Sequence, residues 1–151
     1  MLRGWSALLE IAVEARADQL RLAPLDESGI MMRKHFLQLD GLGVRDLHFD
    51  GDDLYILAGP TMVLNGDIRI FKWPAARPFL AANREPARFE SGLTESIALP
   101  HGRGTNRAEA ICNLPANLSD GNPSWLVLYD APGADRIEGE HTVFGDLLRQ
   151  H

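Results

Sequence analysis

Two short apolar runs flank an aspartate–glycine turn in Asp46-Leu47-His48-Phe49-Asp50-Gly51-Asp52-Asp53-Leu54-Tyr55-Ile56-Leu57. A turn of this composition favours a hairpin, because Asp-Gly readily adopts the positive φ values that a primed turn requires. Leucine, isoleucine and tyrosine fill both faces of this hairpin, as in strands sandwiched between neighbouring layers. The pattern therefore predicts an antiparallel hairpin inside an all-β domain.

The same order of features returns later in the chain. Glu109-Ala110-Ile111-Cys112 precedes a second Asp-Gly turn, and the apolar run Trp125-Leu126-Val127-Leu128 follows it. The first unit ends with Gly66-Asp67-Ile68-Arg69-Ile70-Phe71, and Gly139-Glu140-His141-Thr142-Val143-Phe144 takes this place in the second. Repeats with several short strands per unit are typical of β-propeller blades. We therefore predict that the two units superpose as three-stranded antiparallel sheets, with the acids that begin them at matching positions.

The strands before this repeat read as part of another blade. Trp5 to Val13 and His35 to Leu39 have the pattern of two outer strands whose inner strands are missing. Arg88-Phe89-Glu90 is expected to close the full blade as its outer edge strand, after a loop from Pro74 to Pro86. The sequence thus predicts a single domain over residues 1–151 with a remnant blade (1–43), a blade (44–91) and an incomplete blade (106–151).

This strand count predicts a partial propeller, all-β and built from blades of short antiparallel strands. Propellers have roughly four to eight blades, so the chain cannot close a ring by itself. We therefore expect either a homo-oligomer or missing upstream blades, because open sheet edges and apolar faces pair with something.

Length and charge limit the functional classes. The chain has 151 residues and a formal net charge of −6, and it shows no basic stripe that would bind nucleic acid. No apolar run approaches the roughly 18 residues of a membrane span, and no signal peptide is recognisable at Met1-Leu2-Arg3-Gly4-Trp5. We expect a cytoplasmic protein with neither nucleic-acid nor membrane partners, or a periplasmic one if the true N-terminus lies upstream. Cys112 is the only cysteine, which excludes an intrachain disulfide.

Four stretches resemble one bacterial family, catalogued as domain of unknown function 3616: Leu2-Arg3-Gly4-Trp5, Gly43-Val44-Arg45-Asp46-Leu47, Asp67-Ile68-Arg69-Ile70-Phe71-Lys72-Trp73-Pro74 and Ala108-Glu109-Ala110-Ile111. The resemblance covers nearly the whole chain but only the C-terminal part of the family, whose members carry further blades upstream. It implies a propeller-like fold with Glu-Gly-Ile or Glu-Ala-Ile elements on inner strands. The family has no established activity, so the resemblance implies no function.

The acids at the heads of the predicted inner strands are the best functional signal. Asp46 and Glu109 would face a central channel, where carboxylates could hold Ca²⁺ or Mg²⁺, since both ions prefer oxygen ligands. Asp130 follows the next strand and completes the predicted set of metal ligands. The alternative is structural: each inner-strand acid would accept hydrogen bonds from the backbone of a neighbouring blade, and Asp130 would cap its turn.

Two arginines flank these acids. Arg45 lies one residue before Asp46, whereas Arg107 lies two before Glu109, so strand alternation sends the arginines to opposite faces relative to their acids. Arg45, Asp46, Arg107 and Glu109 are therefore the predicted ligand-binding residues, and an ion pair between blades is the alternative for the arginines.

These residues support two functional hypotheses. The first is a ligand- or partner-binding scaffold without chemistry of its own, because no pairing of a nucleophile with a base is recognisable. The second is a divalent-metal hydrolase of a phosphate ester or lactone in the propeller channel, with Asp46, Glu109 and Asp130 as ligands and Arg107 on the substrate anion. Fold alone does not choose between them.

Overall fold

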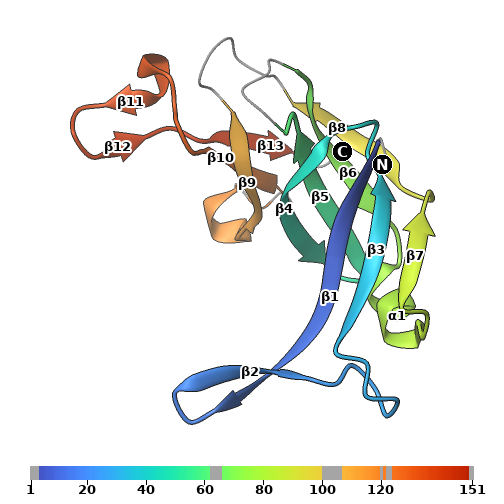
Figure 1. Cartoon of the computed structure of the whole chain (residues 1–151). Coiled ribbons are helices and arrows are strands. Elements are labelled where there is room, and N and C mark those ends of the chain that lie inside the picture. The colour runs from blue at the N-terminus through green and yellow to red at the C-terminus, as the bar shows by residue number, and fades with distance from the viewer. Residues whose placement is uncertain (1–3, 62–65, 100–106, 120, 122–123, 150–151) are drawn as a thin grey trace.

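The computed structural model describes residues 4–61, 66–99, 107–119, 121 and 124–149. In this part of the chain, the strands form three open sheets that pack next to one another, and a small two-stranded hairpin extends from the third sheet (Figure 1). The predicted all-β class is confirmed, and the open sheets are consistent with a partial, propeller-like fold.

The first sheet has the strand order β2-β1-β3-β7. Its longest strand, β1 (Trp5–Arg16), pairs antiparallel with β2 (Gln19–Ala23) on one side and with β3 (Met32–Gln38) on the other. The two segments predicted as outer strands are therefore neighbours. On the far side of β3 lies β7 (Ala87–Glu90), which runs parallel to it.

The middle sheet has the order β4-β5-β6-β8, entirely antiparallel. Its strands are β4 (Gly43–Asp50), β5 (Asp53–Gly59), β6 (Ile68–Trp73) and β8 (Thr94–Leu99). The predicted hairpin joins β4 to β5, with Asp50 opposite Asp53. Gly51 begins the turn with a φ of 58°, and a residue with a β-carbon rarely adopts such a value.

The third sheet has the order β13-β10-β9, with β9 (Ala108–Leu114), β10 (Ser124–Tyr129) and β13 (Asp146–Arg149). Between β9 and β10 lies the 3₁₀ turn η1 (Ala116–Leu118), and the predicted Asp-Gly turn there falls partly outside the described residues. The turn η2 (Ala134–Arg136) leads into the projecting hairpin of β11 (Ile137–Glu138) and β12 (Thr142–Val143) (Figure 1).

The middle sheet is buried on both faces. Leu54 and Ile56 on β5 join a core with Leu37 of the first sheet. Leu57, on the opposite face of the same strand, joins a core with Trp125 of the third sheet. Alternate residues of one strand therefore enter different cores, which explains why the sequence of β5 is apolar on both faces.

The predicted outer edge of the middle blade is wrong. Residues 87–90 belong to the first sheet, and β8 is the edge strand of the middle sheet. The cause is tertiary: on β7, Glu90 contacts the buried His35 ring, and Phe89 stacks on Phe36 with ring centroids 4.9 Å apart. The segment predicted as a loop between the two prolines also contains a short helix, α1 (Ala76–Ala82).

The predicted third strand of the second unit is also wrong. Residues 139–144 turn back at Gly139, where φ is 66°, and form part of the β11–β12 hairpin instead. The Phe144 amide donates to the Arg136 carbonyl at 2.8 Å and closes this hairpin. The third strand of the sheet is β13, so the two units share their first two strands but not their third.

Candidate functional site

The edge strands β4 of the middle sheet and β9 of the third sheet lie side by side, and both contain a β-bulge. The register of β4 skips Arg45, and the register of β9 skips Glu109. A bulged residue is left out of the ladder and its side chain is re-aimed. Arg45 and Glu109 therefore occupy equivalent positions, and the predicted match of Asp46 with Glu109 is wrong by one residue.

The two bulged residues meet across the sheets. A guanidinium nitrogen of Arg45 forms an ion pair with Glu109, and its Nη2 donates to the Pro60 carbonyl at 2.8 Å. The Arg45 side chain is only 10% exposed. A β-carbon on Gly59 would overlap the Arg45 side chain, so glycine permits this close approach. An ion pair therefore joins the neighbouring sheets here, which agrees with the alternative hypothesis that Arg45 pairs with an acid of the next blade.

A pocket of about 540 Å³ opens at this ion pair. Arg107 reaches it from the segment before β9, and Thr61 reaches it from the segment after β5. The alternation of side chains along a regular strand predicted that the two arginines lie on opposite faces. The bulges at Arg45 and Glu109 interrupt this alternation, and both arginines line the pocket. The lining residues are Gly43, Val44, Arg45, Gly59, Pro60, Thr61, Arg107 and Glu109.

The pocket carries an excess of positive charge. Burial of the guanidinium, and then the positive charge of Arg107, lower the pKa of Arg45 below its usual value. Glu109 neutralises the positive charge of Arg45, but no carboxylate among the described residues forms an ion pair with Arg107. Among the described residues that line the pocket, the two guanidiniums and one carboxylate leave one positive charge unneutralised.

Asp46 does not line the pocket. Its Oδ2 accepts the backbone N–H of Ile111 on β9 at 2.7 Å, and its Oδ1 accepts the N–H of Leu47 at 2.8 Å. The Asp46 carboxylate thus accepts a hydrogen bond from the backbone of the neighbouring sheet. This is the structural role that was the alternative to metal binding for the inner-strand acids. A buried N–H without such a partner would cost roughly 1–3 kcal/mol.

The third predicted metal ligand, Asp130, is exposed just after the end of β10. Within the part of the chain that the structure describes, no group of three His, Cys, Asp or Glu side chains could hold a metal ion. Asp46, Glu109 and Asp130 therefore do not form a common ligand set, and the Ca²⁺ or Mg²⁺ site stays a prediction from the sequence.

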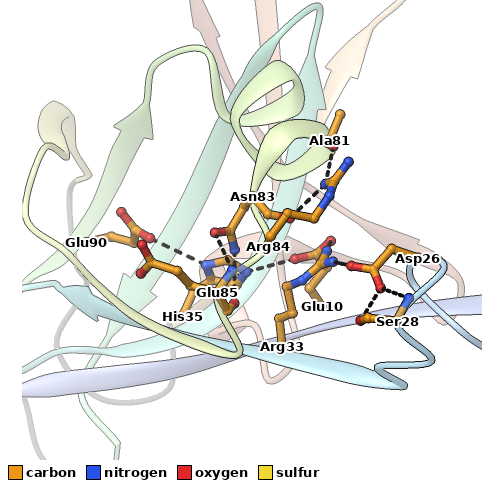
Figure 2. Close-up of polar contacts among 10 residues, drawn as sticks. All are labelled: Glu10, Asp26, Ser28, Arg33, His35, Ala81, Asn83, Arg84, Glu85 and Glu90. Atoms are coloured by element: carbon orange, nitrogen blue, oxygen red, sulfur yellow. Dashed lines mark hydrogen bonds and ion pairs between the residues drawn. The ribbon is translucent and has the colours of Figure 1, made fainter.

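Sequence reasoning missed a second polar cluster, which lies on the buried face of the first sheet (Figure 2). His35 is fully buried, with Nε2 3.0 Å from Glu10 Oε2 and Nδ1 3.5 Å from Glu90 Oε1. Arg33, which is 2% exposed, donates to Glu10 at 3.1 Å and also pairs with Asp26. We call these five side chains the buried polar cluster.

The buried polar cluster is enclosed by apolar and aromatic groups. The rings of Trp73 and Phe79 lie 5.6 and 6.4 Å from the imidazole. Side-chain and backbone hydrogen bonds from Ser28, and then Arg33, lower the pKa of Asp26. The three carboxylates face the Arg33 guanidinium and the His35 imidazole, and Glu90 also forms an ion pair with Arg88 at 3.3 Å. Each buried charge thus has a partner, as the low dielectric of the interior requires.

The sequence carries part of the signal for this cluster. Glu10 interrupts the apolar run of β1, Arg33 and His35 are two positions apart, and so are Arg88 and Glu90. Each pair therefore lies on one face of a strand. The pattern could not be read as a cluster because nothing in the sequence pairs β7 with β3.

Comparison with known proteins gives one match. A family of proteins of unknown function (DUF3616) matches residues 1–146. No curated protein and no solved structure matches the chain. Among the described residues, none of the helices has both the length and the apolar character to cross a membrane.

Proposed function

The chain belongs to the family of proteins of unknown function DUF3616, and we propose that it is a propeller-like binding scaffold that holds a small anion. The proposed site is the pocket between β4 and β9, and Arg107 is the residue that contacts the anion. The observation that carries the proposal is the pairing of Arg45 with Glu109 while Arg107 has no carboxylate partner among the described residues.

Charge and shape favour a small carboxylate. A monoanion would restore neutrality to the two guanidiniums and Glu109. Arginine presents a planar fork of N–H donors that matches the two oxygens of a carboxylate, and such bidentate pairs combine strength with orientation. The hydroxyl of Thr61 on the pocket wall offers a further hydrogen-bond donor.

The arrangement supports binding rather than hydrolysis. Asp46 is engaged by two backbone amides, Glu109 by Arg45, and Asp130 lies outside the pocket. A hydrolase would need a carboxylate or histidine free to act as base or metal ligand at the pocket. The carboxylate that lines this pocket is already committed to an ion pair, so we retain the scaffold hypothesis.

Thermal unfolding with sodium acetate, compared with sodium chloride at equal ionic strength, tests this proposal. At ten times its dissociation constant, acetate would stabilise the folded state by about 1.4 kcal/mol, which corresponds to a rise in Tm of roughly 3–6 °C for a domain of this size. Sodium phosphate forms a second arm, because the guanidinium fork also matches phosphate oxygens, and a larger shift with acetate than with phosphate is the result expected for a carboxylate site.

Arg107→Gln should abolish the acetate shift while leaving the Tm without acetate nearly unchanged, because Arg107 has no ion-pair partner to lose in the described part of the chain. Arg21→Gln is the matched control, since Arg21 is an exposed arginine on β2, outside the pocket, that donates to Gln19. An equal shift in the Arg107→Gln variant, or none in the parent protein, would contradict the proposal.

A further inference from the structure

The two outward faces of the three-sheet stack are apolar. On the first sheet, Leu9, Ile11 and Val13 point away from the middle sheet and are 54%, 51% and 57% exposed. Met32, which pairs with Ile11, and Phe89 on β7 extend this surface across the sheet. We call this surface the first outer face.

The first outer face is continuous and almost free of charge. Phe36 stacks on Phe89, and Trp5 meets Phe89 edge to face with ring centroids 5.0 Å apart, so aromatic rings form one end of it. Lys34 is the only charged residue that the strand register places on this face in the described part of the chain. Monomeric proteins rarely expose contiguous apolar patches larger than a few hundred Å².

The third sheet has a smaller apolar surface on its far side, with Arg149 at one end of it. Trp125 and Val127 of β10 are buried against the middle sheet, so Leu126 and Leu128 point away from it. Leu147 on β13 lies opposite Leu126, and Leu128 and Leu147 are 44% and 48% exposed. We call this surface the third outer face.

The chain already contains two interfaces in which one apolar sheet face packs on another. The middle sheet packs an apolar face on the first sheet and another on the third. The first and third outer faces would continue this series if they met each other, but they belong to opposite ends of one chain. We propose that a second copy of this chain docks head to tail, so that the first outer face of each copy packs on the third outer face of the other.

The count of sheets supports a closed pair. A head-to-tail contact generates a ring when its rotation closes, and closure after two copies gives a twofold dimer with two identical contacts. The described part of each chain forms three sheets of three or four strands, so two copies would contribute six such sheets, and this number falls within the range of roughly four to eight blades in propellers.

The apolar area is also sufficient. The large side chains on the two outer faces are about half exposed, and together they offer on the order of 500 Å² of apolar surface per chain. Two copies would therefore bury on the order of 1,000 Å² of apolar surface, which reaches the size of a specific protein–protein interface.

Light scattering and sedimentation of the full chain at micromolar concentration test the proposal. We expect a species of twice the 16.7 kDa chain mass. Ile11→Lys on the first outer face and Leu147→Lys on the third should each convert it to monomer, because each variant places a charge in both contacts of the ring. Leu118→Lys is the control, because Leu118 is an exposed leucine on η1, outside both faces.

Mixing separates a head-to-tail contact from other dimers. Ile11→Lys keeps its third outer face intact and Leu147→Lys keeps its first, so an equimolar mixture should form a dimer through one intact contact although neither variant dimerises alone. If Leu147→Lys remains a dimer, the contact joins two first outer faces and the proposal is overturned. A monomeric parent protein with a cooperative melt, or a species larger than a dimer, would overturn it as well.

Discussion

Glu10 contacts both Arg33 and His35, the two most buried polar side chains of the first sheet, so its removal should be costly. In the variant Glu10→Ala, Arg33 would retain only Asp26 and His35 would retain only Glu90. Both donors are essentially inaccessible to water, since Arg33 is 2% exposed and His35 is fully buried. Water therefore cannot replace the lost carboxylate.

The expected cost follows from this burial. Breaking a buried ion pair by deleting one partner destabilises a protein by about 3–5 kcal/mol, which lowers the Tm by roughly 10 °C for a domain of this size. Glu10→Gln keeps the shape and one acceptor oxygen but loses the charge. It should therefore fall between Glu10→Ala and the parent protein, near the 1–3 kcal/mol of a charged hydrogen bond.

Urea unfolding followed by tryptophan fluorescence measures this free energy, because Trp73 lies beside the cluster. Glu14→Ala is the matched control: Glu14 is on the same strand and face, but its partner Arg16 is exposed. An exposed pair contributes about 0–1 kcal/mol. The reasoning would be refuted if Glu10→Ala and Glu14→Ala had the same free energy of unfolding.

Three further predictions concern the pocket and the third sheet. Burial, then the hydrogen bond to Asp146, raise the pKa of Tyr129 to about 12 from 10.0. The stabilisation from this group is complete below pH 10 and is lost as the pH rises toward 12, so urea titrations should show a decline in stability over that window that Tyr129→Phe lacks. Gly59→Ala should force Arg45 from its position, cost about 1–3 kcal/mol by chemical denaturation and weaken acetate binding, whereas Gly92→Ala, where a β-carbon meets open space, should do neither. Ca²⁺ or EDTA should leave the Tm unchanged, because the three predicted carboxylate ligands form no common group in the described part of the chain; a rise with Ca²⁺ that EDTA reverses would contradict this.

Local patterns were sufficient to predict the strands whose pairing is local. The β4–β5 hairpin followed from its Asp-Gly turn and from the apolar residues on both sides of it. In this hairpin the interacting residues are neighbours in sequence, and the turn between them fixes the register.

Distant pairing was not predictable. The β7 strand joins β3 although residues 39–86 lie between them in sequence, and the contacts of Glu90 and Phe89 account for this pairing. The bulges at Arg45 and Glu109 shift side-chain direction by one residue, and no turn or glycine marks them in the sequence. Three of the four predicted ligand-binding residues line one pocket. Regular alternation of side chains along the strands had predicted opposite faces for the two arginines among them.

The parallel strand β7 also bears on how this protein folds. Repeat proteins are often modular, with each unit stable on its own apart from contacts with its neighbours. Here the chain leaves the first sheet after β3, builds three strands of the middle sheet, and returns to add β7. The first sheet is therefore completed by a strand that lies beyond three strands of the middle sheet in sequence, and amide hydrogen exchange in β3 and β5 should report a single cooperative opening rather than two independent ones.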